Sequence, residues 1–154
     1  MSISKFMGSA SLAAVLAWSV GGGTLGSGCS HVPGYHIGQA WPMSNAKQVP
    51  AASGEVRVVS VDSGNATIDV GVKHLARPDE AFPGTQAYVV WLKPDEGGAA
   101  QNLGELPLGD DLQGNLRTKT AFKRFELFIT AEQQANVTSP SGNRVLDTAV
   151  SIPG

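Results

Sequence analysis

The chain has 154 residues, a length that suits one domain with short extensions. Glycine and proline supply 19 and 9 of these residues, well below the roughly 25 to 30% share of disordered low-complexity chains, so we expect a folded protein. The 11 Lys and Arg against 13 Asp and Glu give a net charge of −2, which excludes an electrostatic basis for binding nucleic acid. A single cysteine excludes an internal disulfide and a cysteine-rich zinc site.

Residues 1–28 have the layout of a secretory signal peptide. Lys5 is the only charged residue among them, and an apolar run over 6–20 ends at three consecutive glycines. This run is shorter than the about 20 residues that a membrane-spanning helix needs. We therefore predict a signal peptide over 1–28, with a membrane span as the weaker alternative.

Residues 25–29 (LGSGC) resemble the cleavage box of bacterial lipoproteins, in which the cysteine thiol is acylated and becomes the new N-terminus. Leu25 stands four residues before Cys29, and Gly26 occupies the position where lipoproteins usually have leucine. The resemblance implies a lipid at Cys29, and several acyl chains give a stable membrane anchor. Ser30 after the cysteine implies the outer membrane, with the protein facing the periplasm or the exterior. The alternative is a lone cysteine beside an ordinary cleavage site.

Residues 29–53 are predicted to form a flexible, proline-rich tether that begins with the lipidated cysteine. Their apolar residues follow neither the period of a strand nor that of a helix, and three prolines interrupt them. His31, His36 and Met43 lie in this segment, and imidazole and thioether groups are ligands that suit copper. They are weak candidates for a copper site, and an ordinary linker is the alternative.

From residue 54 to residue 154 the sequence changes to short β-rich runs separated by turn residues. Polar and apolar residues alternate over 67–74, as in a strand with one wet face, whereas 88–92 is apolar on both faces. Residues 62–65 have the composition of a hairpin turn, and 78–82 that of a single helical turn. The predicted strands are 56–61, 67–74, 88–92, 103–108, 112–120, 125–130 and 146–152. This pattern predicts an all-β fold, an immunoglobulin-like antiparallel β-sandwich of about seven strands. The predicted core residues are Val58, Ile68, Val70, Val72, Val90, Leu92, Phe125, Leu127, Ile129 and Val150.

Seven segments between about residues 49 and 152 carry a resemblance to one family. They are 49–52 (VPAA), 72–76 (VKHLA), 83–84 (PG), 88–91 (YVVW), 102–104 (NLG), 118–120 (TKT) and 125–132 (FELFITAE). With these segments the chain resembles a family of functionally uncharacterised bacterial exported proteins. More loosely, it is similar to the extracytoplasmic sandwich of anti-sigma-K-type factors. Such a factor needs a cytoplasmic helical domain, and only five residues precede the apolar run. The resemblance therefore implies a fold and an exported location, and no catalytic or ligand-binding residue.

The sequence offers little for catalysis. His74 is the single histidine of the 54–154 domain, and the alternation places it on the inward face at the end of a strand. We predict a hydrogen-bonded histidine at the core edge, with a catalytic base as the alternative. No nucleophile-elbow or phosphate-loop motif is present in the sequence. We therefore predict that the protein is not an enzyme and uses no cofactor.

Three further groups of residues have both a structural and a functional interpretation. The acidic pairs at 79–80, 95–96 and 110–111 fall in predicted turns, where exposed loop tips are favoured over calcium ligands. Tyr88 and Trp91 are predicted to pack between two sheets rather than to stack on a sugar. The basic cluster comprises Arg117, Lys119, Lys123 and Arg124. For it, a solvated face is favoured over a site for an anion or a lipid headgroup.

Together these features predict a cell-envelope lipoprotein that acts as a non-catalytic binding or structural module. We expect its partners to be the membrane, through the N-terminal lipid, and an envelope protein, with no nucleic acid. The edge strand near Pro107 and the loop 94–101 are the candidate contact surfaces. The alternatives are a periplasmic protein that binds a small ligand or copper and, third, an envelope hydrolase.

Overall fold

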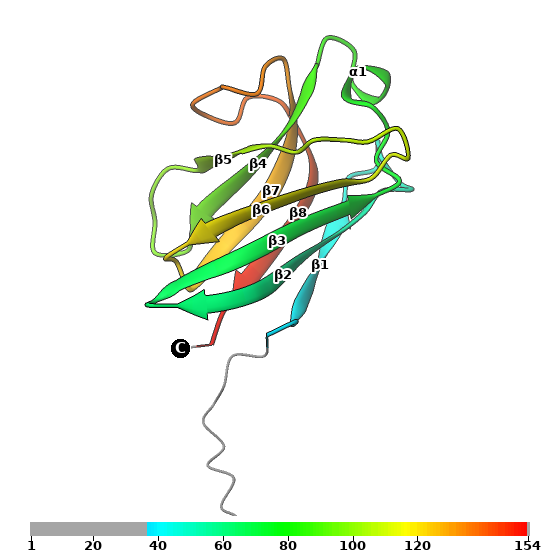
Figure 1. Ribbon diagram of the computed structural model, residues 1–154. Coiled ribbons are helices and arrows are strands. Elements are labelled where there is room, and N and C mark those ends of the chain that lie inside the picture. Colours follow the sequence, from blue (N-terminus) through cyan, green and yellow to red (C-terminus); the bar gives the residue numbers. More distant parts are fainter. Residues whose placement is uncertain (1–36, 154) are drawn as a thin grey trace, which may run out of the picture. The chain divides into compact units, whose positions relative to one another are not determined.

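The computed structural model describes residues 37–153, which fold almost entirely into antiparallel strands (Figure 1). The strands are β1 (Ala40–Asn45), β2 (Ser53–Asp62), β3 (Asn65–Lys73), β4 (Ala87–Pro94), β5 (Gln101–Glu105), β6 (Gly114–Thr120), β7 (Arg124–Glu132) and β8 (Asn143–Ser151). One helical turn, α1 (Pro78–Ala81), lies between β3 and β4, as predicted. The all-β fold is confirmed, with eight strands in the described part of the chain. The predicted signal peptide, Cys29, His31 and His36 lie outside the described residues.

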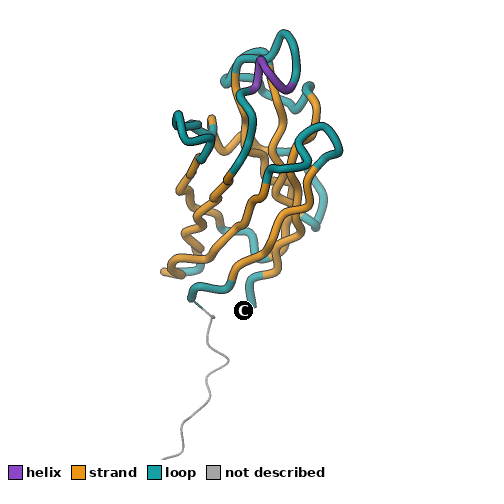
Figure 2. The backbone as a smooth tube through the Cα atoms, turned by 90° about the vertical axis from the view of Figure 1, so that its right-hand side faces the viewer, coloured by secondary structure: helices purple, strands orange, loops and turns teal. Residues whose placement is uncertain are grey.

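The strands follow one hydrogen-bonded order, β5-β4-β7-β8-β1-β2-β3-β6, in which β1 joins two halves. Its residues 40–43 pair with β2, and its last two residues, Ser44 and Asn45, pair with β8. Because β1 passes from one half to the other, the sheet folds over on itself into two layers. One layer contains β1, β2, β3 and β6, and the other contains β8, β7, β4 and β5 (Figure 1, Figure 2).

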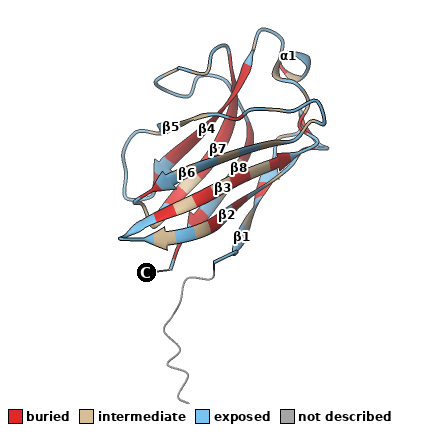
Figure 3. Cartoon of the chain, in the orientation of Figure 1, coloured by how far each residue is buried: buried red, intermediate tan, exposed pale blue. Residues whose placement is uncertain are grey.

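The main core lies between these two layers and is built from the alternate apolar residues of the strands. The burial of all ten predicted core residues is confirmed: Val58, Ile68, Val70, Val72, Val90, Leu92, Phe125, Leu127, Ile129 and Val150. Along β3 the residues that face outward are half-buried or exposed, whereas β4 is buried on both faces from Ala87 to Leu92 (Figure 3). A strand buried on both faces needs a cover on its outer side.

Part of the predicted tether is folded, so the prediction of a flexible tether over 29–53 is wrong for 40–53. β1 lies in this range, and the turn after it packs Val49 and Ala52 into the main core. The side-chain amide of Asn45 holds the turn by donating to three of its carbonyl oxygens at 3.0 to 3.2 Å. This segment shows no strand period by itself. It forms a strand because β2 and β8 supply backbone partners for it, which only the folded chain brings close.

The hairpin predicted at 62–65 joins β2 to β3. Asp62 pairs with Asn65, and the two residues between them, Ser63 and Gly64, have positive φ angles of 48° and 85°. Two positive φ angles in a two-residue loop are typical of a type I′ turn, whose twist matches that of the flanking strands. The turn therefore sets the register in which Ile68 and Val70 face the core.

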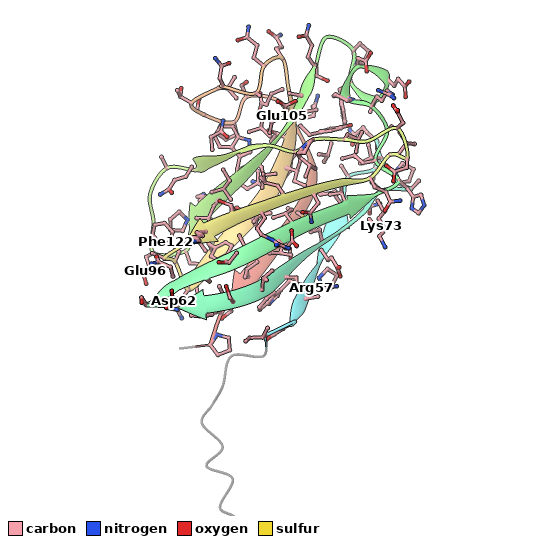
Figure 4. The ribbon with its side chains drawn as sticks, in the orientation of Figure 1. Arg57, Asp62, Lys73, Glu96, Glu105 and Phe122 are labelled. Carbon is pink, nitrogen blue, oxygen red and sulfur yellow. The ribbon has the colours of Figure 1, made fainter. Side chains whose placement is uncertain are left out.

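The connections between strands gather at two opposite ends of the sandwich. The hairpin end carries the short connections 63–64, 95–100 and 121–123. The loop end carries the longer connections 46–52, 74–86, 106–113 and 133–142. Asp62, Glu96 and Phe122 mark the hairpin end, and Lys73 marks the loop end (Figure 4). β1 runs toward the loop end, so the chain enters the sandwich from the side of the hairpin end.

Candidate functional site

The loop end is the candidate site, because its long connections contact one another and border two cavities. The guanidinium group of Arg77 donates to the carboxylate of Asp110 at 2.8 Å, and the N–H of Leu75 donates to the carbonyl of Leu112 at 3.1 Å. The ion pair is exposed and contributes little to stability. These bonds nevertheless hold connection 74–86 against connection 106–113.

Tyr88 anchors connection 74–86 from within the sandwich. Its ring is buried in the main core, and its hydroxyl donates to the carbonyl of Ala76 at 2.7 Å. Burial, together with the negative charges of Asp79 and Glu80, raises the pKa of Tyr88 to about 12. The phenol therefore stays protonated at neutral pH, and the ring is not exposed for stacking on a sugar.

A trough of about 590 Å³ crosses the outer face of the β1-β2-β3-β6 layer beside the loop end. It follows one row of neighbours on adjacent strands: Pro42, Glu55, Gly71 and Asn115. Its other lining residues are Ser53, Gly54, Val72, Lys73, Pro107, Asp111, Gln113 and Gly114. A volume of this size suits a small ligand.

The charges that line the trough nearly balance. Glu55 pairs with Arg57 at 2.6 Å, and the carboxylate of Asp111 accepts the N–H of Gln113 at 3.2 Å. Lys73 adds one exposed ammonium group where β3 ends at the loop end (Figure 4). The trough thus offers donors and acceptors of hydrogen bonds without a strong field of either sign.

A second cavity of about 490 Å³ also lies at the loop end, between connection 74–86 and the end of β5. Arg77, Asp79 and Glu105 line it with charged groups, and Leu106 and Leu108 line it with apolar groups. Both cavities therefore lie near the same set of connections. Ligand sites are often formed by loops at one end of a rigid scaffold.

Trp91 is buried, as predicted, but on the other face of its sheet rather than between the layers. Its ring stacks on Phe128 with 6.5 Å between centroids and 16° between planes. Val89 and the partly buried Ala100 and Val137 complete this second apolar cluster. The side chain of Arg144 covers Phe128, with its guanidinium carbon 4.0 Å from the ring centroid. Connection 133–142 supplies part of the outer cover of β4 through Val137, and connection 95–100 adds Ala100.

Glu132 is a buried carboxylate at the loop end that the sequence reasoning missed. It is only 1% exposed, and it accepts the hydroxyls of Thr130 at 2.6 Å and Ser141 at 2.7 Å, and the N–H of Ser141 at 3.0 Å. Burial alone would raise the pKa of Glu132, but these bonds and the N–H of Gly142 hold it below its ordinary value. Glu132 thus fastens connection 133–142. The only sign in the sequence is an acid directly after a run of mostly apolar residues.

His74 and Met43 do not occupy the places predicted for them. His74 is exposed, with a positive φ of 55°, because the backbone leaves the strand after Lys73 and turns the imidazole away from the core. The expectation of a core-edge histidine is therefore wrong. Met43 is buried in the main core with its sulfur against Gly54, which removes it from an exposed copper site. Among residues 37–153, no group of three or more His, Cys, Asp or Glu could hold a metal ion.

Most of the remaining sequence candidates lie on the surface. Lys123 is the exception, because it is half-buried with its ammonium nitrogen shielded from solvent, so the prediction of a solvated face is wrong for this residue. The acidic pairs at 79–80, 95–96 and 110–111 are exposed in α1 and in two connections. Arg117 and Lys119 share the outer face of β6, and Arg117 donates to Asp69 on β3 at 2.8 Å. Within the described range 37–153, no helix is long and apolar enough to cross a membrane.

No protein-family model matches the chain, and no curated protein matches it in sequence. The resemblance to exported proteins and to anti-sigma-K-type factors therefore stays a prediction.

Proposed function

We propose that the protein is a cell-envelope lipoprotein, anchored through Cys29, whose sandwich acts as a non-catalytic binding module. The observation that carries the proposal is the division of connections between the two ends. The chain enters from the side of the hairpin end, and every long connection lies at the loop end. An anchor before β1 would leave the loop end free to meet a partner in the envelope.

Binding rather than catalysis is supported by what the perturbed groups of the loop end do. Glu132 holds connection 133–142 through its hydrogen bonds, and Tyr88 holds connection 74–86 as a neutral phenol. Neither lines the trough, and Tyr88 lines the second cavity with its hydroxyl bonded to the carbonyl of Ala76. These groups stabilise the connections, whereas a catalytic acid or base has to face its substrate.

A small ligand is the second candidate for what the module binds. The trough favours it, because a concave surface of about 590 Å³ with several converging polar groups is the usual form of a small-ligand site. Copper is the weaker version of this candidate, since Met43 is buried and only two of its three proposed ligands, His31 and His36, remain.

The anchor is tested by the intact mass of protein from the membrane fraction. We expect wild-type protein to begin at Cys29 and to carry acyl chains, and the Cys29→Ser variant to lack them and to leave the membrane. Unlipidated, soluble wild-type protein would contradict the anchor.

The binding surface is tested by photo-crosslinking in the native membrane. Crosslinkers placed at Gln134 and Asp110 probe the loop end. Crosslinkers at Ser63 and Glu96 probe the hairpin end, where the loop 94–101 lies that the sequence offered as another contact surface. We expect one envelope protein to be captured repeatedly from the loop end only. Capture of nothing, combined with a hydrolytic activity that His74→Ala abolishes, would overturn the non-catalytic function.

A further inference from the structure

We propose that the trough beside the loop end binds a short uncharged glycan. The inference rests on the proposed function, because it names a ligand class for the same binding module. Three features of the trough support it: a glycine that keeps the trough open, a polar lining and a balance of charge.

Gly71 keeps the trough open although the fold does not need a glycine there. It lies inside β3, where glycine weakens a strand through its conformational entropy. Its φ is outside the left-handed region, and a Cβ atom would meet one neighbour, the side-chain nitrogen of Asn115, at an ordinary 3.9 Å. A Cβ atom would therefore fit, and a larger side chain such as valine would extend from it into the space between Glu55 and Asn115. Glycine inside a strand often marks a place where a ligand approaches the backbone.

The side chains around Gly71 have the chemistry that recognises hydroxyl groups. The polar lining residues are Ser53, Glu55, Lys73, Asp111, Gln113 and Asn115. Carboxylate and amide groups are planar and offer two hydrogen-bonding atoms each, so one such group can bond two neighbouring hydroxyls of a sugar ring. Pro42 and Pro107 add apolar residues to the lining, against which the C–H face of a sugar can rest.

The balance of charge favours an uncharged ligand over an ion. Arg57 neutralises Glu55 at 2.6 Å, and the ammonium group of Lys73 opposes the carboxylate of Asp111 within the same lining. A phosphate would meet two carboxylates, and a metal cation would meet Lys73, so either ion finds a like charge. A neutral polyol meets donors and acceptors without this cost.

The lining contains no aromatic ring, so the trough lacks the stacking surface that strengthens binding to sugars. We therefore expect weak binding, with a Kd on the order of 1 mM. The test must accordingly use a method that detects weak complexes.

The experiment is a titration of the full chain, labelled with ¹⁵N, with maltotriose, cellotriose and triacetylchitotriose, followed by NMR. We expect at least one trisaccharide to shift the amide signals of Gly71 and Asn115. We expect Gly71→Val to abolish these shifts while its thermal midpoint rises, since valine stabilises a strand. A second variant, Asn115→Ala, should raise the Kd at least fivefold.

Thr67→Val is the matched control, because Thr67 lies on the same outer face of β3 but outside the trough. It should bind the glycan as wild type does. Absence of shifts with all three trisaccharides would overturn the inference, and so would shifts caused by alanylalanine and by none of the sugars. If either result overturned the inference, the loop-end crosslinks could still be measured in Gly71→Val. Crosslinks that persist in this variant would show that the proposed function does not depend on a glycan in the trough.

Discussion

The indole N–H of Trp91 donates to the hydroxyl of Thr130 at 2.8 Å across β4 and β7. That hydroxyl donates in turn to the carboxylate of Glu132 at 2.6 Å. The same carboxylate accepts hydrogen bonds from the N–H and the hydroxyl of Ser141. The chain of bonds runs along the face of the sheet that is turned away from the main core. It joins the second apolar cluster to connection 133–142, so the packing of Trp91 and the place of this connection depend on each other.

Thr130→Val tests this chain of bonds, because valine keeps the shape of threonine and removes the hydroxyl. The change leaves the buried indole N–H without its acceptor and removes one of the two donors to the same oxygen of Glu132, which still accepts the N–H of Ser141. An unsatisfied buried polar group costs about 1 to 3 kcal/mol, so we expect the free energy of unfolding to fall by about 1 to 3 kcal/mol. Urea denaturation measures it. Thr67→Val, at a partly exposed position, should change the same quantity by less than about 0.5 kcal/mol. Equal losses in both variants would rule out the assigned role of Thr130.

The stability of the protein should fall in acid because of Glu132. Burial raises the pKa of this carboxyl, but hydrogen bonds to Thr130 and Ser141 outweigh burial and keep it below the ordinary 4.5. A carboxyl whose pKa is lower in the folded state stabilises the fold above its ordinary pKa, and this contribution is lost as the pH falls through the folded pKa. We therefore expect the free energy of unfolding to drop between about pH 5 and pH 3.

The same pH series with Glu132→Gln isolates this contribution. The variant should be less stable than wild type at pH 7 and should show a smaller loss between about pH 5 and pH 3, since the residue no longer titrates. The residual loss would come from other carboxyls such as Asp69. Burial raises the pKa of Asp69, but its hydrogen bonds to Arg117 and Asn115 hold this pKa below its ordinary value. Parallel curves for wild type and variant would contradict the role of Glu132.

Asn102 should control the local opening of connection 133–142. Its side-chain amide donates to the carbonyls of Ala135 at 3.0 Å and Val137 at 2.8 Å, and its oxygen accepts the N–H of Gly104 at 2.8 Å. We expect Asn102→Ala to speed hydrogen exchange in 133–142 and acrylamide quenching of Trp91, because the cover of that ring loosens. The free energy of global unfolding should fall by only about 1 to 2 kcal/mol, because the variant loses only these hydrogen bonds. Gln101→Ala is the control on the same strand, and equal exchange in both variants would refute the assignment.

Ser63→Asn should stabilise the hairpin between β2 and β3. Ser63 has a φ of 48°, and asparagine adopts positive φ with less strain than serine, which makes Asn-Gly the preferred pair for this turn. We expect the free energy of unfolding to rise by about 0.5 kcal/mol. Gly64→Ala, at a φ of 85°, should lower it by about 1 kcal/mol. Thermal unfolding of both variants measures the two shifts, and a less stable Ser63→Asn would contradict the turn geometry.

The sequence by itself determined the inward face of the regular strands, but not the places of His74 and Trp91. The alternation of Ile68, Val70 and Val72, the apolar run at 88–92 and the turn at 62–65 are local properties, because side chains of a strand alternate whatever the strand pairs with. Local patterns of this kind also predicted the helical turn at 78–82. They did not reveal how the strands join into layers.

Only the tertiary structure decided what happens where distant segments meet. β1 becomes a strand because β2 and β8 offer it backbone partners, and Met43 is buried as a result. Trp91 and Glu132 lie beneath connection 133–142, which the pattern of their own strands does not show. The trough depends on Gly71 standing between Glu55 and Asn115, a register set by pairing across three strands. The physical reason is common to all three. Hydrogen-bond partners and covering side chains come from residues far away in the sequence, and their contacts lower the free energy only after the chain has folded and brought them together.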